Sequence, residues 1–353
     1  MTYEPRRRRP PRLRDVADLA GVSMKTVSNV VHGYAHVRPE TRRRVQAAID
    51  KTGYRPQLAA QHLRTGSSGI VTLAVPSLTF GYFSDIAQHF IDRARELDRT
   101  VLLHTTSGGR EQELEVFEGF KRRLGDGVIF NPLLIEEEIF SLFEEFPQPT
   151  VLIGEHVPDG ALPRNADYVR IDNVRASADA TAHLLSAGRG RLAFVGALPH
   201  GPVPHPHGSA ALRMEGFRQA LARHGIDPDS APAPEVANWH RTDGRRAAHV
   251  LSAEHPEVDG IVCGNDELAL GVLTGLRDVD RRVPDQVAVI GYDDSPDAPF
   301  AYPSLSSISP DKTFLARLAL DMLGERIAGY EGPPRMVTAP YQLIARDSSA
   351  AAR

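Results

Sequence analysis

Four side chains of one short N-terminal stretch have the types and the spacing to read DNA: Met24, Lys25, Ser28 and Asn29. On a helix they would lie on the side away from the apolar face, and so in solvent. Lysine donates hydrogen bonds to guanine O6 and N7, and asparagine pairs with adenine. A helix that carries this set is predicted to contact base edges in a major groove.

The element that positions these side chains is a helix-turn-helix over residues 13–31, LRDVADLAGVSMKTVSNVV. Apolar residues at helical spacing lie on both sides of a Gly-Val-Ser turn, which predicts two short helices crossing at an angle. Gly21 relieves the backbone at the turn, and Ser23 caps the helix that follows at residues 24–31. A third helix is predicted from Pro39 to about residue 51. Ordinary packing of two helices is the alternative interpretation.

The charge of the chain is divided unevenly along its length. Residues 1–66 contain 14 Lys and Arg against 5 Asp and Glu, a net charge of +9, and the remaining 27 and 40 give −13. A basic head before an acidic body indicates a nucleic-acid partner for the head alone. The arginines at positions 6–9, 12 and 14 form either a flexible arm that contacts phosphates or a solubilising tail.

From residue 70 onward, short apolar runs alternate with longer amphipathic ones. This alternation predicts parallel sheets with helices on both faces. Strands are expected at residues 70–75, 100–104, 127–130, 151–153, 191–195, 260–262 and 287–290, and helices at 83–97, 111–123, 176–187, 211–224, 244–253 and 267–278. The pattern runs twice and breaks around residues 158–172. We therefore expect two similar lobes, with a ligand in the cleft between them at the carboxyl ends of the strands.

Several classes of protein are disfavoured by the sequence. Its single cysteine, Cys263, excludes an internal disulfide framework and fits a reducing cytosol. No apolar run is long enough to span a membrane and no secretory signal is found, so a cytoplasmic protein is expected. The histidines of residues 199–208 (His200, His205 and His207) are interpreted as part of a loop and not as a metal site. The sequence has no phosphate-binding loop, nucleophile elbow or metal-ligand set, so neither an enzyme nor a cofactor is expected.

The order of the motifs resembles that of the LacI/GalR family of transcriptional regulators. The segments that carry the resemblance run from residue 13 to about 347: LRDVADLAGVSMKTVSNVVHG, RPETRRRVQAAIDKTGYRP, LAAQHLRTG, YVRIDN, AGRGRLAFVG, CGNDELALG, VPDQVAVIGYDDSP and PSLSSISPD. The resemblance implies a dimeric or tetrameric DNA-binding protein. It also implies a body similar to periplasmic sugar-binding proteins, and an effector that alters operator affinity.

The resemblance assigns the DNA contacts more closely. Met24 and Lys25 match the family positions that choose the operator, whereas many relatives have arginine where this chain has Asn29. Phosphate contacts, which position a protein without reading sequence, are expected from Ser23, Thr26 and His32. A hydroxyl contact within the helix is an equally good interpretation of Thr26.

Residues 57–64 resemble the family's hinge helix, in which Leu63 falls on the leucine that wedges between base pairs in the minor groove. The segment is too short to be a stable helix alone, so it is expected to fold when two copies meet on DNA. The hinge would then be the switch through which the body changes DNA affinity. A linker without such a function is the alternative.

By the resemblance, the effector contacts residues that follow predicted strands of the body. The amide of Asn265 and the carboxylates of Asp266 and Asp293 suit sugar hydroxyls. Trp239, the single tryptophan, would stack on a sugar ring, although it is otherwise interpreted as a core residue. Asp294 is expected to stabilise its turn. Three further residues complete the candidate effector site: Ser77, Phe83 and Arg213.

Two positions depart from sugar-binding relatives. Ala211 stands where many of them place arginine, which leaves Arg213 as a substitute, and Gly154 stands where they often have aspartate. The usual polar clamp is therefore incomplete. A non-standard sugar, a sugar phosphate, a nucleoside or no effector at all each stays open.

Together these observations predict a small all-α helix-turn-helix head and an α/β, periplasmic-binding-protein-like body of two lobes with parallel sheets. The expected parts are a basic arm (1–11), the DNA-binding domain (12–56), a hinge helix and linker (57–66), an effector-binding and dimerisation domain (67–347) and a tail (348–353). The expected function is that of a repressor that binds a two-fold symmetric, double-stranded DNA operator as a homodimer or tetramer, without a membrane partner. Activation, or a sugar-binding module without DNA function, is the alternative.

Overall fold

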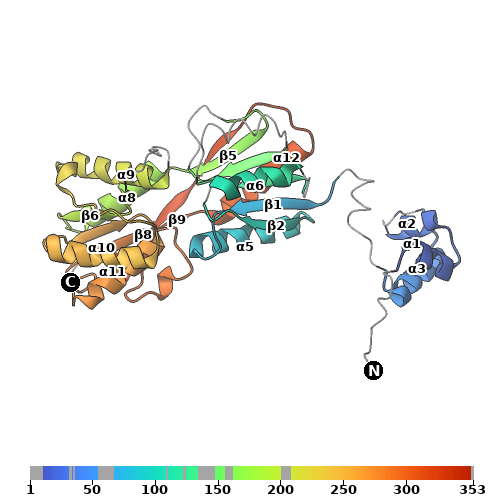
Figure 1. Cartoon of the computed structure of the whole chain (residues 1–353), viewed down its shortest axis with the longest axis horizontal. Helices are drawn as coiled ribbons and strands as arrows, with labels where there is room; N and C mark the ends of the chain where they lie inside the picture. The colour runs from blue at the N-terminus through green and yellow to red at the C-terminus, as the bar shows by residue number, and fades with distance from the viewer. Residues whose placement is uncertain are drawn as a thin grey trace, which may run out of the picture. The chain divides into compact units, whose positions relative to one another are not determined.

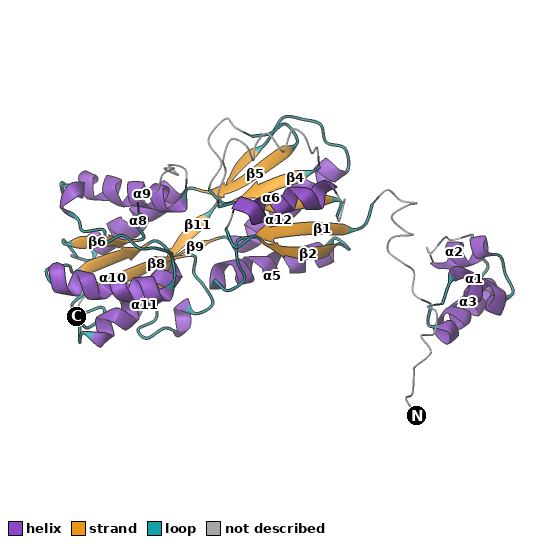
Figure 2. Cartoon of the chain, viewed as in Figure 1, coloured by secondary structure: helices purple, strands orange, loops and turns teal. Residues whose placement is uncertain are grey.

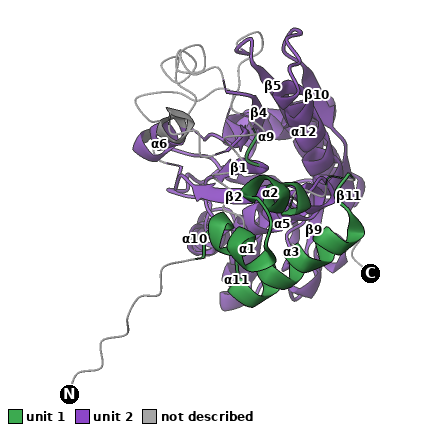
Figure 3. Cartoon of the chain, turned by 90° about the vertical axis from the view of Figure 1, so that its right-hand side faces the viewer, with its two compact units in different colours: residues 1–68 green, residues 69–353 purple. Residues whose placement is uncertain are grey.

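The computed structural model describes residues 11–31, 34, 36–54, 67–108, 110–121, 125–133, 148–155, 162–199 and 208–350. The chain forms two compact units, residues 1–68 and residues 69–353, each of which is considered by itself (Figure 3). Several predictions concern residues outside the described ranges: the arm up to residue 10, His32, the hinge segment with Leu63, and the histidines at 200, 205 and 207. Among the described helices, none combines the length and the apolar character needed to cross a membrane.

The first unit is a three-helix head. It consists of α1 (Leu13–Ala20), α2 (Met24–Val31) and α3 (Pro39–Thr52). Their apolar faces meet in one core of buried residues: Val16, Ala17, Ala20, Val27, Val30, Val45 and Ala48. Gly21 ends α1 with a φ of 63°, a left-handed conformation that glycine adopts at low cost. The turn therefore sets α2 across α1, and the predicted helix-turn-helix is confirmed.

A six-stranded parallel sheet forms the first lobe of the second unit. Its order is β10-β5-β4-β3-β1-β2. The strands are β1 (Ile70–Val75), β2 (Thr100–Thr105), β3 (Gly127–Phe130), β4 (Thr150–Ile153), β5 (Ala166–Ile171) and β10 (Met336–Ala339). The helices are α5 (Gly81–Glu96), α6 (Arg110–Lys121) and α12 (Lys312–Ile327). Helices α5 and α12 pack against each other, and α12 also covers β3, β4 and β5 (Figure 1).

A five-stranded sheet forms the second lobe, in the order β11-β9-β8-β7-β6. Its strands are β6 (Leu192–Val195), β7 (Gly260–Cys263), β8 (Ala288–Tyr292), β9 (Ser306–Pro310) and β11 (Tyr341–Ile344), of which only the edge strand β11 is antiparallel to its neighbour. The helices are α8 (Asn173–Ser186), α9 (Ser209–Arg223), α10 (Arg241–Glu254) and α11 (Asp266–Asp278), with short 3-10 turns at Pro228–Ser230, Ala298–Phe300 and Asp347–Ser349. The α8–α9 pair and the α10–α11 pair lie on opposite faces of the sheet (Figures 1 and 2).

Alternate residues of the second-lobe strand β6 pack into different cores. In β6, Leu192 and Phe194 join the core that contains Phe217 of α9, whereas Ala193 and Val195 join the core under α10 and α11. Successive side chains of a strand point to opposite faces, so a strand covered on both sides must be apolar throughout. This is why such strands appear in the sequence as short, continuous apolar runs.

Helices α10 and α11 approach unusually closely at three glycines, Gly244, Gly271 and Gly275, of which the first two are the tightest. A Cβ on Gly271 would lie 2.0 Å from the carbonyl oxygen of Arg241, and one on Gly244 would lie 2.1 Å from that of Leu268. Any larger side chain at either position would force the helices apart. The close pair brings the segment before α10 next to the segment before α11, and both segments line the site described below.

The prediction that the pattern simply runs twice was wrong about the connections. Residues 166–171, inside the expected break at 158–172, form β5 of the first sheet. After the second lobe is built, α12 and β10 return to the first lobe, and β11 goes back to the second. The described chain therefore passes between the lobes three times.

Four strands and one helix escaped prediction: β5, β9, β10, β11 and α12. Strand β9, SSISP, is mostly polar in sequence, and yet it is buried. Its hydroxyls are satisfied inside the protein, since Ser307 donates to Asp266 at 2.7 Å and Ser306 donates to the Arg346 carbonyl at 3.1 Å. A strand buried through such long-range hydrogen bonds leaves no apolar pattern in the sequence.

Candidate functional site

Helix α2 presents the candidate base-reading side chains to different degrees. Met24 is 52% exposed and Lys25 is also exposed, whereas Ser28 and Asn29 are half-buried one turn later. The side-chain amide nitrogen of Asn29 lies 3.4 Å from a ring nitrogen of His36. Met24 and Lys25, at the start of the helix, are therefore the most accessible of the four.

Ser23 and Thr26 form a cap at the start of α2. The Oγ of Ser23 accepts a hydrogen bond from the backbone N–H of Thr26 at 3.1 Å, and the two hydroxyls lie 2.9 Å apart. The cap satisfies a backbone donor at a helix start that has no partner within the helix. Ser23 thus has the capping role expected from its position, and the phosphate contacts of Ser23 and Thr26 stay predictions.

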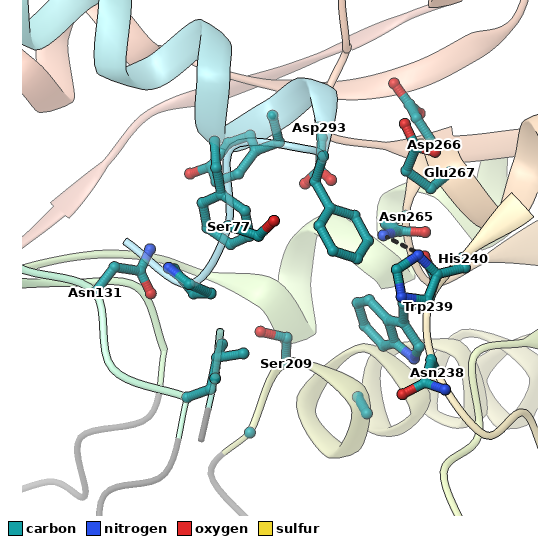
Figure 4. A pocket seen from close by; sticks show the side chains of 18 of the residues that line it. Ser77, Asn131, Ser209, Asn238, Trp239, His240, Asn265, Asp266, Glu267 and Asp293 are labelled. Carbon is teal, nitrogen blue, oxygen red and sulfur yellow. Dashed lines mark hydrogen bonds between the residues drawn. The ribbon is translucent and has the colours of Figure 1, made fainter. Parts of the chain in front are cut away.

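A cavity of about 550 Å³ lies between the two lobes of the second unit (Figure 4). Its walls come from the segments that follow β1, β3 and β4 in the first lobe and β7 and β8 in the second. The carboxyl ends of parallel strands meet at one edge of a sheet, which is where such folds bind ligands. All the candidate effector residues line this cavity: Ser77, Phe83, Arg213, Trp239, Asn265, Asp266 and Asp293.

Arg213 is the fixed cation of the cavity, and its side chain is 7% exposed. Its Nε donates to the side chain of Asn173 at 2.7 Å, and Nη1 donates to the carbonyl of Gly264. Nη1 also lies 3.8 Å from the Asp293 carboxylate, and the guanidinium carbon is 3.5 Å from the ring centre of Tyr292. These contacts hold the guanidinium in place before any ligand binds, which lowers the ordering cost of binding.

Of the two α9 positions considered for the arginine of the polar clamp, only position 213 lines the cavity. Ala211, two residues earlier on α9, is not among the residues that line the cavity. Gly154 has a φ of 100°, and a Cβ there would lie 2.9 Å from the side-chain oxygen of Asn131. An aspartate at position 154 would therefore be strained, whereas the carboxylate of the adjacent Glu155 lines the cavity.

Asp293 follows β8 and its carboxyl group is almost completely buried. Burial raises its pKa to about 8, although the nearby Arg213 lowers it. At neutral pH a protonated carboxyl group can both donate and accept a hydrogen bond. Asp293 therefore suits a ligand hydroxyl, which also does both.

Asn265 and Asp266 have their own partners within the protein. The side-chain oxygen of Asn265 caps α11 by accepting from a backbone N–H at 2.8 Å, and its amide donates to the carbonyl of Trp239 at 3.3 Å. Asp266 accepts from the Ser295 N–H at 2.6 Å and from the Ser307 hydroxyl at 2.7 Å, and burial raises its pKa to about 6. Both residues thus shape the cavity wall as well as line it.

Trp239 is half-buried; it packs against the core and also lines the cavity, and its stacking on a sugar ring stays a prediction. Its ring packs against the core under α10 and α11, and its Nε1 donates to the carbonyl of Gly196 at 3.1 Å. The rest of the ring lines the cavity, across from Ser77 and Asn131 (Figure 4). A ring anchored in this way offers a fixed flat face to a ligand.

The sequence did not point to two contacts that join the lobes across the cavity. The rings of Phe80 and His240 stack with centroids 4.8 Å apart and planes 28° apart. The hydroxyl of Ser209 donates to the Glu155 carboxylate at 2.8 Å. Glu155 and Phe80 each come shortly after a predicted strand, so the strand-end rule used for Asp293 would have found them.

Asp294 lies outside this cavity. Its carboxylate accepts from Arg346 at 2.7 Å, and its backbone N–H donates to the Ser307 hydroxyl at 3.0 Å. These bonds hold the turn after β8. Within the described part of the chain, no group of three or more His, Cys, Asp or Glu side chains is placed to hold a metal ion.

Comparisons with known proteins agree with this architecture. Residues 12–57 match a model of the bacterial regulatory proteins of the lacI family, and residues 181–349 match a periplasmic binding protein-like domain. The transcriptional regulator AscG of Escherichia coli (strain K12) is 30% identical over 344 residues, which cover 95% of this chain and 97% of AscG.

Two solved structures extend the comparison. A lac repressor dimer bound to operator and the anti-inducer ONPF superposes with a TM-score of 0.83 at 25% identity, over 97% of this chain and 100% of that one. A complex of the regulator CelR with cellobiose gives a TM-score of 0.69 at 28% identity, over 96% and 99%. The fold and the resemblance predicted from the motifs are both confirmed. This chain belongs to the LacI family of bacterial transcriptional regulators.

Proposed function

We propose that this regulator is a repressor whose affinity for its DNA operator is altered by a small carbohydrate bound between the lobes. The observation that carries the proposal is the cavity, in which the flat face of Trp239 lies beside the polar groups of Arg213 and Asp293. An aromatic face suits the C–H surface of a sugar ring, and donor–acceptor groups suit its hydroxyls. The volume lies within the range of small-molecule sites, about 300–1,000 Å³.

The relatives support a carbohydrate over the other effectors that the sequence left open. CelR, which this chain resembles along almost its whole length, is seen in complex with cellobiose. The single cationic side chain among the described cavity residues that is not a histidine, Arg213, already uses Nε and Nη1 for Asn173, Gly264 and Asp293, so at most Nη2 remains for a ligand. A phosphate group favours a cation with donors to spare. We therefore place an uncharged carbohydrate ahead of a sugar phosphate.

For the operator we propose that Met24 and Lys25 read base edges, with Ser28 and Asn29 beside them. Their position at the exposed start of α2 supports this assignment. A two-fold dimer would present two copies of the helix to inverted half-sites of double-stranded DNA. Such an operator would be chromosomal, so we place the protein in the cytoplasm. We add two residues to this proposal on the basis of the sequence alone. His32 would contact a phosphate, and Leu63 would wedge between base pairs in the minor groove.

The DNA part of the proposal is tested by selecting operators from random duplexes with the full-length protein. We expect inverted repeats whose binding weakens steeply as salt is raised. The variant Lys25→Gln should change the bases selected, whereas the matched control Lys51→Gln removes one charge from α3 and should leave the selected bases unchanged. Leu63→Ala should weaken operator binding. Failure to select any sequence would refute the assignment as a sequence-specific regulator.

The effector part is tested with the intrinsic fluorescence of Trp239, the only tryptophan in the chain. Titration with cellobiose, ribose, glucose 6-phosphate and adenosine samples the open classes of effector. A compound that shifts the emission is then added to the complex with the selected operator. We expect a carbohydrate to alter operator affinity. Carbohydrate binding without any change in operator affinity, or a response to adenosine or glucose 6-phosphate alone, would contradict the proposal.

A further inference from the structure

A second cavity, with polar walls, lies where β9 leads into α12. Its lining includes Asp85, His89, Asp294, Lys312 and Tyr341. Lys312 is the first residue of α12, and its side chain is only 7% exposed. Its ammonium group donates to the Asp85 carboxylate at 2.6 Å and to the Asp294 carbonyl at 2.8 Å. A buried ammonium group requires such partners, because burying an unpaired charge is very costly.

The two acceptors of Lys312 belong to different lobes. Asp85 lies on α5 of the first lobe, and Asp294 lies in the turn after β8 of the second. Both neighbour residues of the effector cavity: Asp293 precedes Asp294, and Tyr82 lies one helical turn before Asp85. The Lys312 ammonium is also 5.8 Å from the ring centre of Tyr82. Lys312 therefore contacts the two lobes directly behind the cavity walls.

The turn that Lys312 holds is in a conformation that needs support. The backbone φ angles of Asp293 and Asp294 are 105° and 46°, and residues other than glycine rarely adopt such positive values. Such backbone persists only where the surroundings fix it. Arg346 and Ser307 hold the Asp294 side chain and N–H from within the second lobe. Next to the close approach of Ser295 to Gly81 at the start of α5, Lys312 adds a charged link from this turn to Asp85 of α5 in the first lobe.

We propose that Lys312 is a positioning residue that couples the effector cavity to helix α5. By tying the Asp293–Asp294 turn to Asp85, it makes the position of the turn depend on the relative position of the two lobes. An effector that contacts Asp293 would then shift α5, and not the second lobe alone. The coupling to DNA rests on the proposed function, whereas the tether between the lobes does not.

A matched control exists on the same two helices. Arg93 of α5 and Asp321 of α12 form an ion pair at 2.7 Å, and Asp321 is 43% exposed. The pair joins α5 to α12 as Lys312 and Asp85 do, but it lies wholly within the first lobe. Loss of helix packing would therefore affect Asp321→Asn and Lys312→Met alike, while loss of the tether would affect Lys312→Met alone.

The first test uses the full-length protein without DNA or small molecules. Hydrogen exchange is measured at the backbone amides of Asp294 and Ser295, which are hydrogen-bonded in the turn. Lys312→Met keeps the aliphatic stem and removes the ammonium, so we expect exchange about five- to tenfold faster than in the wild type. Asp321→Asn should leave these amides unchanged. Equal exchange in Lys312→Met and the wild type would overturn the tether.

The second test measures binding to the selected operator with and without cellobiose as the probe, or with the carbohydrate that the fluorescence titration identifies. In Lys312→Met we expect operator affinity without probe to stay within about twofold of wild type. The factor by which saturating probe changes that affinity should fall at least about fivefold, and Lys312→Arg should restore part of it. An unchanged factor in Lys312→Met would overturn the coupling.

Two further outcomes need their own measurements: a Lys312→Met protein that does not fold, and a wild-type protein that does not respond to any carbohydrate. If Lys312→Met does not fold, Asp85→Asn removes the charge at the other end of the tether and is expected to give the same two results. If no carbohydrate changes operator binding in the wild type, the proposed function fails. The exchange measurement still decides the tether in that case, because it requires neither ligand nor DNA.

Discussion

Replacing Asp167 with asparagine should lower the free energy of unfolding by about 3–5 kcal/mol. Asp167 lies in β5 with a fully buried side chain, and it accepts hydrogen bonds from Arg326 at 2.8 and 2.9 Å and from the Arg335 guanidinium at 2.8 Å. Arg326 is itself 4% exposed. An asparagine would turn one acceptor into a donor that faces guanidinium donors, and it would leave a buried cation without its counter-charge.

The loss of unfolding free energy in Asp167→Asn should depend on pH, because the carboxyl group of Asp167 titrates. Burial raises the pKa of Asp167, but the hydrogen bonds from Arg326 and Arg335 outweigh it and hold the pKa below its ordinary value. A carboxyl group with a lowered pKa stabilises the folded state above its unfolded pKa of about 4. That contribution is lost as the pH falls through the folded pKa. The difference between wild type and Asp167→Asn should therefore be full at pH 7 and shrink below about pH 4.

Urea unfolding followed by circular dichroism measures the effect. The control Asp229→Asn breaks an ion pair with Arg218 in which Asp229 is 79% exposed, so it should cost no more than about 1 kcal/mol. Arg326 lies in the last turn of α12 and Arg335 precedes β10, so the lost stability belongs to the segment that returns to the first lobe. A cost for Asp167→Asn below about 1 kcal/mol at pH 7 would refute the reasoning, because a broken buried pair costs more than a surface one.

Three further predictions concern the head and the effector cavity. Lys25→Gln should weaken binding to the selected operator by about 1–3 kcal/mol and relax the base preference at one position, as measured by gel shift on single-base variants; equal loss on all sequences would indicate a phosphate contact instead. Ser23→Ala should destabilise the head by about 1 kcal/mol through loss of the α2 cap, measured by thermal unfolding, and an unchanged midpoint would contradict the cap. Because burial raises the pKa of Asp293 to about 8, the folded protein keeps a proton that the unfolded chain loses near pH 4, and stability should fall as pH rises from 4 to 8. Asp293→Asn should flatten this decline, and parallel pH profiles for the two proteins would count against the raised pKa.

The head could be predicted almost completely from the sequence. The helix expected at residues 24–31 is α2, and the one expected from Pro39 ends at Thr52, one residue beyond the expected limit. Gly21 and Ser23 also have their expected roles at the turn. Helix periodicity, the left-handed glycine and the cap are all set by residues within one or two turns of each other. Such local rules need no knowledge of the rest of the fold.

The sequence also predicted which residues line the cavity, but it did not predict what each of these residues contacts. All seven candidate residues line the cavity, and Ser77, Asn265 and Asp293 do so because they come directly after strands whose carboxyl ends converge. Only the structure places Asn265 and Asp266 on partners within the protein, and only the structure brings Phe80 onto His240 from the other lobe. A residue's hydrogen-bond partner depends on chain segments that its own neighbourhood in the sequence does not reveal.

By itself, therefore, the sequence determined the helix-turn-helix, the alternation of strands and helices, and the strand ends that hold the site. The tertiary structure alone decided that β5 completes the first sheet, that α12 returns to the first lobe, and that Lys312 joins Asp85 to Asp294. The physical reason is distance along the chain. Local patterns record which side chains avoid water, whereas an ion pair between residues 227 positions apart exists only once the whole chain has folded.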